Sequence, residues 1–214
     1  FSGGYLASAF VTDTRRAVCK YDNPIFLITD EKIEQVNQIL PSLEIAAREG
    51  RPLIIVAEEM EGQALAALIM NTVRGSMKVA AIKAPKYGEE RRAILNDLAV
   101  STGAKFFQRS MGHKLADASL RDFGKAATVE ITKSMTTVVD GEGDHESVDE
   151  TIERLKEEIK QTEDIHIARR LQERVTRLSS GVAIIRVGAS SEVEMIEKKH
   201  RIEDALEAVR SAQQ

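Results

Sequence analysis

The amino-acid sequence predicts an α/β fold built around a βαβ core. Between residues 25 and 103, three short apolar runs alternate with three longer stretches of helical periodicity. A glycine follows each helical stretch closely, as is common where helices end. The apolar runs show little polar alternation, which is typical of strands covered on both faces. This order favours a sheet whose strands are joined by right-handed crossovers.

The first two strand–helix units follow one another without a long loop. Residues 25–29 (IFLIT) predict the first strand, and residues 33–48 predict the helix after it. Pro41 lies inside this helix and is expected to kink it or to split it in two. Residues 52–56 predict the second strand, and residues 61–74 predict the second helix.

The third unit is followed by a change of pattern. Residues 78–82 predict a strand and residues 89–102 predict a helix. The next two strand-length runs, residues 127–132 and 136–139, are separated by a turn and predict a β-hairpin. Residues 140–144 (DGEGD) predict a loop.

Helices dominate the rest of the chain. Residues 147–161 and 164–178 predict two charged helices joined by a short connection, and hence an antiparallel helical hairpin. Five apolar residues are expected to face inward: Ile152, Leu155, Ile159, Leu171 and Val175. Residues 182–187 predict one more strand, and residues 192–214 a terminal helix with few partners of its own. We therefore expect this terminal helix to belong to a different domain.

Composition and charge narrow the function classes. The net charge is −4 with both signs interspersed, which disfavours a nucleic-acid partner. Apolar runs such as residues 53–57 are far too short to cross a membrane. The one cysteine, Cys19, leaves no internal disulfide and fits a reducing compartment. The chain begins without Met or a signal-peptide pattern and ends within a helical pattern, so we expect an excised fragment.

The helix at residues 61–74 is apolar in more than one direction. No charged residue lies between Gly62 and Thr72. Helical spacing puts three residues within one sector: Leu65, Ile69 and Val73. Two others fall on a different side, Ala64 and Leu68, and Met70 widens the apolar circumference. Such a helix is either buried all round, or it forms a partner-binding groove with the helix at 33–48, which carries Ile39, Leu40 and Leu43. Periodicity leaves both interpretations open.

Longer sequence segments resemble a known family. The resemblance to the GroEL-type (group I) chaperonins rests on residues 54–71 (IIVAEEMEGQALAALIMN), 81–88 (AIKAPKYG), 171–195 (LQERVTRLSSGVAIIRVGASSEVEM) and 197–206 (EKKHRIEDAL). It covers essentially the whole chain, and segments of this length are far more specific than a short motif. It implies that residues 1–180 form the apical domain and that residues 181–214 return into the intermediate domain.

The resemblance also implies a function. Apical domains of this family line the opening of seven-membered rings, usually stacked in pairs, and bind non-native polypeptides and a GroES-type co-chaperonin in an apolar groove. Carried over by position, the groove residues are Tyr5, Phe10, Leu40, Leu43, Leu65, Ile69 and Met70. With this family, the groove interpretation outweighs the buried-helix interpretation. The family further implies a bacterial cytoplasm, a mitochondrial matrix or a plastid stroma.

The resemblance assigns ATP hydrolysis to the full-length protein. Asp204 matches the acidic residue that positions the attacking water, in an assembly that holds ATP and Mg²⁺. The chain has no GxxxxGK[ST] phosphate loop, so we expect no cofactor and no ATPase activity in this fragment. Glu192 matches an inter-subunit ion-pair position, but its usual arginine partner is replaced by Gly3.

Other positions depart from the family pattern. Ala9 stands where the groove usually has a second tyrosine, Gln63 replaces an acidic rim residue, and Lys86-Tyr87 replaces Gly-Phe. These changes suggest a divergent paralogue or an altered client preference. One rival is a structural or regulatory relative that has lost folding activity.

Another rival is an α/β enzyme domain with a ligand pocket at the strand ends, where Glu58, Glu59 and Lys83 form no familiar catalytic set. The four histidines lack metal-ligand spacing, and residues 140–144 lack the full spacing of a calcium loop. We therefore expect no metal site.

Overall fold

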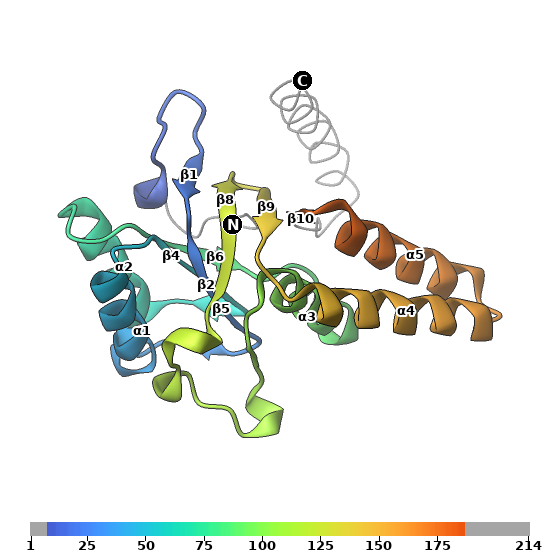
Figure 1. Cartoon of the computed structure of the whole chain (residues 1–214). Coiled ribbons are helices and arrows are strands. Elements are labelled where there is room, and N and C mark those ends of the chain that lie inside the picture. Colours follow the sequence, from blue (N-terminus) through green and yellow to red (C-terminus); the bar gives the residue numbers. More distant parts are fainter. Residues whose placement is uncertain (1–7, 187–214) are drawn as a thin grey trace.

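A mixed eight-stranded sheet forms the centre of the computed structural model, which describes residues 8–186 (Figure 1). The main strand order is β10-β9-β8-β2-β4-β6, with β1 paired to β8 and β7 paired to β2. Helices α1 and α2 lie together on one side of the strands, and α3 lies on the other (Figure 1). The predicted α/β class is confirmed.

The parallel half of the sheet contains the three predicted core strands. They are β2 (Ile25–Thr29), β4 (Leu53–Ala57) and β6 (Val79–Lys83), with Phe26 opposite Ile54 and Ile54 opposite Ala80. Every residue of β2 and β4 is buried, which explains why their sequences show no polar alternation.

The direction in which the chain crosses this sheet determines which face each helix covers. Helices α1 (Val36–Glu49) and α2 (Gly62–Val73) join β2 to β4 and β4 to β6. After α3 (Gly88–Thr102) the chain returns to the far side of β2 as β7 (Phe106–Phe107). Right-handed crossovers in opposite directions put helices on opposite faces, so α3 is separated from the α1–α2 layer.

The antiparallel half contains the predicted hairpin, formed by β8 (Gly124–Ile131) and β9 (Met135–Gly141). Strand β8 begins beside β2 and continues beside β1 (Cys19–Asp22), with Cys19 opposite Ile131. Strand β10 (Val182–Arg186) pairs with β9 and belongs to the same sheet. The described chain ends there, and a domain boundary at residue 180 stays a prediction.

The predicted helical hairpin is confirmed as α4 (His145–Gln161) and α5 (Ile165–Ser180). The Asp164 carboxylate caps α5 by accepting hydrogen bonds from the backbone N–H groups of His166 and Ile167. Between the helices lies a small apolar cluster, separate from the main core: Leu155, Leu171, Val175 and Leu178. The other two predicted inward residues, Ile152 and Ile159, pack against this cluster.

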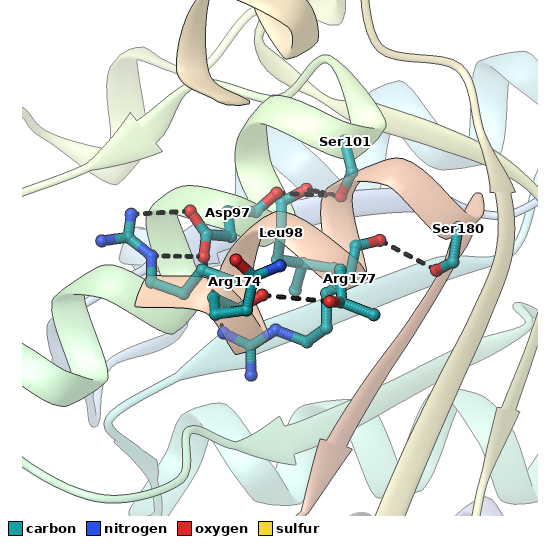
Figure 2. A network of polar contacts seen from close by, with 8 residues as sticks. Asp97, Leu98, Ser101, Arg174, Arg177 and Ser180 are labelled. Atoms are coloured by element: carbon teal, nitrogen blue, oxygen red, sulfur yellow. Dashed lines mark hydrogen bonds and ion pairs between the residues drawn. The ribbon is translucent and has the colours of Figure 1, made fainter. Parts of the chain in front are cut away.

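An ion pair connects this hairpin to the sheet domain (Figure 2). Asp97 lies on α3 and is almost fully buried, and both of its oxygens accept 2.8 Å hydrogen bonds from the Arg174 guanidinium. Arg177 lies further away, 3.5 Å from one Asp97 oxygen. Hydrogen bonding to Asp97 raises the pKa of Arg174, which therefore stays charged. The paired geometry fixes α5 against α3.

Several short elements were not predicted. Strands β3 (Lys32–Ile33) and β5 (Glu59–Met60) form a separate two-stranded sheet. There are also four short 3₁₀ helices among the described residues: Ser8–Phe10, Arg109–Met111, Leu115–Asp117 and Leu120–Asp122. Among residues 8–186, no helix has the length and apolar character needed to cross a membrane.

Some bounds of the predicted elements differ in the structure. The first helix begins at Val36 rather than at residue 33, because Lys32–Ile33 pairs with β5. Of the two outcomes predicted for Pro41, a kink or a split, the split is wrong, because α1 continues through Pro41 as one helix. The loop predicted at residues 140–144 begins later, since Asp140 and Gly141 are part of β9. The terminal helix predicted at 192–214 lies outside the described residues.

The glycines of this loop have a packing role. The backbone N–H of Gly143 donates a hydrogen bond to the carbonyl of Ser101, at the end of α3. A Cβ atom at Gly143 would lie 2.1 Å from the carbonyl oxygen of Val100, so the loop needs a glycine to approach α3 this closely. A Cβ atom at Gly141 would likewise lie 2.2 Å from the carbonyl oxygen of Ser101, so packing explains both glycines of this sequence.

Candidate functional site

Helix α2 is buried along one side and open to solvent along another. Ala64 and Leu68 are fully buried, and the helix packs against β6, α1 and the 3₁₀ helix Ser8–Phe10. Met70 and Val73 are exposed, whereas Leu65 and Ile69 lie between, half-buried against the core. This distribution excludes a helix that is buried all round, which was the first of the two interpretations.

Helix α1 adds one apolar side chain to the exposed area. Leu40 is exposed, while Ile39 beside it is fully buried. Helices α1 and α2 contact each other on the same side of the sheet (Figure 1). We name five exposed or half-buried apolar residues of the two helices the α1–α2 surface: Leu40, Leu65, Ile69, Met70 and Val73.

The two helices start next to each other because backbone N–H groups at the start of α2 donate hydrogen bonds to carbonyls just before α1. The carbonyl of Ile33 accepts from the N–H of Glu61 at 3.0 Å, and the carbonyl of Glu34 accepts from the N–H of Ala64 at 3.2 Å. Gly62, the first residue of α2, has φ of +60°, a left-handed conformation that glycine adopts without strain. These bonds set the position of α2 relative to α1.

Charges gather at this end of the helices. The Lys32 ammonium lies 2.9 Å from Glu61 and 3.4 Å from Glu34. The hydrogen bond with Glu61, with a further one to Glu34, raises the pKa of Lys32, and the same Lys32 contact lowers the pKa of Glu61. An open depression beside them is lined by Glu34, Gln35, Val36, Asn37, Glu61, Gly62 and Gln63.

The other end of the surface carries both signs of charge, because Arg48 and Glu49 are exposed where α1 ends and Arg74 is exposed after α2. The middle of α2, between Gly62 and Thr72, has no charge. An apolar ligand placed along α2 would therefore displace water from carbon and sulfur atoms without desolvating an ion, which is the favourable case for hydrophobic binding.

Two predicted groove residues are buried instead of exposed. Phe10 is fully buried beneath α2 and β6, and Leu43 is buried on the inner side of α1. Both support the helices from below and offer no surface to a ligand, so their assignment as contact residues is wrong for this structure. Of the other predicted groove residues, Leu40 and Met70 are exposed, and Leu65 and Ile69 are half-buried. Three predicted functional residues, Tyr5, Glu192 and Asp204, lie outside the described residues.

One exposed residue was missing from the predicted site. Val73 is the most exposed apolar residue of α2, and its helical spacing from Leu65 and Ile69 was the signal that could have included it. Gln63, a predicted rim position, is exposed at the start of α2. Ala9 is half-buried in the 3₁₀ helix that packs on α2.

The charged residues at the strand ends are paired with one another. Lys83 lies 2.9 Å from Glu59, and Arg91 lies 3.4 Å from Glu58. Within residues 8–186, no group of three or more His, Cys, Asp or Glu side chains is arranged to hold a metal ion. These pairs join neighbouring elements, and the enzyme interpretation receives no support from them.

A second hollow lies between α3, α5 and β10. Its floor is apolar and includes Ile94, Ile159 and Ile184, but its rim carries both signs of charge: Lys86, Glu90, Arg169, Glu173 and Arg177. The α1–α2 surface lacks such charges along α2. We therefore take the α1–α2 surface as the candidate binding site.

The sequence was compared with known protein families. The model of the TCP-1/cpn60 chaperonin family matches residues 27–214. The match includes both helices of the α1–α2 surface, the helical hairpin and the residues after β10. It confirms the chaperonin resemblance seen in the sequence.

Proposed function

We propose, because the chain belongs to the TCP-1/cpn60 chaperonin family, that its α1–α2 surface binds exposed apolar segments of non-native proteins. The observation that supports this most directly is the exposure of Leu40, Met70 and Val73 on two neighbouring helices. Exposed apolar residues grouped in this way mark interaction surfaces. Unfolded chains present the complementary chemistry, since their core side chains are still in water.

The size of the surface fits weak, reversible binding. Full burial of one large aliphatic side chain releases about 1.5–3 kcal/mol. Leu40, Met70 and Val73 are 46%, 47% and 71% exposed, and Leu65 and Ile69 are already half-buried, so covering the surface could supply roughly 3–6 kcal/mol before the cost of ordering the bound segment. What remains corresponds to affinities of about millimolar or weaker for one chain. Met70 lets the surface fit many sequences, because its side chain is flexible and polarisable.

We further propose a co-chaperonin partner, a ring assembly and a cellular location for the full-length protein, as the resemblance implies. The same surface would bind a GroES-type co-chaperonin, so that a client and the co-chaperonin compete for it. The full-length protein would form a heptameric ring, single or double, in a bacterial cytoplasm or an organelle interior. A divergent paralogue with altered clients is the alternative, supported by Ala9 and Gln63 beside the surface.

ATP and Mg²⁺ would be bound by the full-length protein rather than by the described residues. The sequence has no phosphate-binding GxxxxGK[ST] loop, and within residues 8–186 no group of three or more His, Cys, Asp or Glu side chains is arranged to hold a metal ion. We assign no catalytic step to these residues. Asp204 would act in hydrolysis within the complete assembly, and the isolated chain would be inactive.

The test compares two double variants with matched exposure. Leu40→Ser/Val73→Ser changes residues that are 46% and 71% exposed on the α1–α2 surface. Ile165→Ser/Ile167→Ser changes residues that are 68% and 45% exposed on α5. Neither pair contributes much to the core, so both variants should keep the circular dichroism spectrum and the unfolding midpoint of the wild type.

The measurement is the affinity for a fluorescently labelled, chemically unfolded model protein, followed by fluorescence anisotropy. We expect the Leu40/Val73 variant to bind at least tenfold more weakly, because two apolar contacts are lost. The Ile165/Ile167 variant should bind like the wild type. Equal losses in both variants, or no loss in the first, would contradict the proposed site.

A further inference from the structure

The methionines of the chain differ sharply in their access to solvent. Met60 and Met135 are almost completely buried, at 1% and 2% exposure. Met70 is 47% exposed on the α1–α2 surface, and Met111 is 66% exposed in a short 3₁₀ helix elsewhere. Met77 is intermediate, partly buried against the core. Thioether oxidation follows solvent access, so Met70 and Met111 are the described methionines most open to a dissolved oxidant.

The one cysteine thiol, that of Cys19, is protected from solvent. Cys19 is fully buried in β1, and burial raises the pKa of its thiol to about 12. A thiol reacts with oxidants as the thiolate, which this pKa makes scarce at neutral pH. A peroxide would therefore meet a reactive sulfur at Met70 before it meets one at Cys19.

Oxidation of Met70 would place a polar group on the apolar α1–α2 surface. It extends from the uncharged side of α2, in the same exposed area as Val73 and next in sequence to Ile69. The sulfoxide is polar and accepts hydrogen bonds, whereas the thioether is apolar and flexible. The apolar side chains of a bound segment offer no donor to that oxygen, which would have to lose its water.

We propose that Met70 is a reversible oxidation site for peroxides, and that sulfoxide formation there weakens the binding of apolar segments to the α1–α2 surface. The inference rests on the proposed function. It adds a redox control that acts on the binding surface itself. Met111 would be oxidised as well, without effect on binding.

The chemistry is a two-electron oxygen transfer. A lone pair on Sδ of Met70 attacks one oxygen of hydrogen peroxide, the O–O bond breaks, and the second oxygen leaves as water after proton transfer. Sulfur is oxidised to the sulfoxide and peroxide is reduced. A methionine sulfoxide reductase, with thiol reductant, returns the thioether and releases the oxygen as water.

The experiment uses the full chain, hydrogen peroxide as the oxidant, and two variants. Met70→Leu removes the proposed oxidation site, and Met111→Leu removes the exposed control site. Peptide mass mapping identifies which methionines gain oxygen. For each protein, the affinity for the labelled unfolded protein is measured before and after treatment, and their ratio is compared. Reduction by methionine sulfoxide reductases A and B follows.

We expect Met70 and Met111 to be oxidised well before Met60 and Met135. Oxidation should weaken binding about tenfold in the wild type and in Met111→Leu, and less than twofold in Met70→Leu. The reductases should restore the wild-type affinity.

An unoxidised Met70, or an equal loss of affinity in Met70→Leu, would overturn the inference while leaving the proposed function intact. Absence of binding before oxidation would instead refute the proposed function, and with it the regulatory role of Met70.

Discussion

Removal of Arg174 should release the helical hairpin from the sheet domain. Arg174→Ala leaves the Asp97 carboxylate almost fully buried without the two 2.8 Å hydrogen bonds that it now accepts (Figure 2). Loss of one partner from a buried ion pair typically costs about 3–5 kcal/mol. Arg177, 3.5 Å from Asp97, remains and compensates in part, so we expect the lower end, about 3 kcal/mol.

The assay is urea unfolding followed by circular dichroism, with hydrogen exchange to locate the change. A loss of about 3 kcal/mol is a large part of the 5–15 kcal/mol that stabilises an ordinary domain. Exchange should increase mainly in α4 and α5, whose small apolar cluster is separate from the main core. Exchange in α2 should change little, because Asp97 and Arg174 lie on other helices.

Two further variants make this prediction refutable. Arg177→Ala should cost less than about 1 kcal/mol, because its contact with Asp97 is longer and Arg177 is more exposed. The double variant Asp97→Ala/Arg174→Ala should be more stable than Arg174→Ala, since it removes the uncompensated buried charge. Two results would show that the bidentate pair does not hold the hairpin. One is an equal loss of stability for Arg174→Ala and Arg177→Ala, and the other is a double variant less stable than Arg174→Ala.

Three other perturbations have defined outcomes. Gly62→Ala forces a side chain into a left-handed conformation and should lower the urea unfolding free energy by about 1–2 kcal/mol, with Gly62→Asn less affected. Burial raises the pKa of Cys19 from 9.0 to about 12, so the folded state retains a proton that the unfolded chain loses. Stability should therefore fall as pH rises from about 9 to 12, by up to about 4 kcal/mol, and Cys19→Ala should flatten this slope in urea unfolding series. Ala9→Tyr should tighten binding of the labelled unfolded protein severalfold by adding apolar area beside α2, and unchanged affinity would argue against a weakened groove.

The parallel core could be predicted because each strand is buried on both faces by local helices. Residues 25–29 and 53–57 are continuous apolar runs, and the structure buries all of them. The glycines after the first and third helices adopt left-handed C-cap conformations, as their positions indicated. Signals of this kind depend on a few neighbouring residues and can be read from the sequence.

Other features depend on partners that are distant in the sequence. Strand β1 (CKYD) mixes polar and apolar residues, and it is a strand because Cys19 to Asp22 pair with residues 128–131 of β8. The burial of Phe10 likewise depends on α2 and β6, which follow it by many residues. The family resemblance indicated which residues surround the surface, but it did not separate the exposed ones from those beneath.

Helix α2 shows why both kinds of information are needed. A helix with apolar residues in every direction normally gains stability from all of them, yet Met70 and Val73 add little here because they remain in water. The helix is instead held by Ala64 and Leu68 below and by backbone bonds from its first turn to residues 33 and 34. The exposed side can therefore change without loss of the fold. Its apolar residues increase the risk of aggregation, and the proposed binding to apolar segments of other chains would account for their exposure.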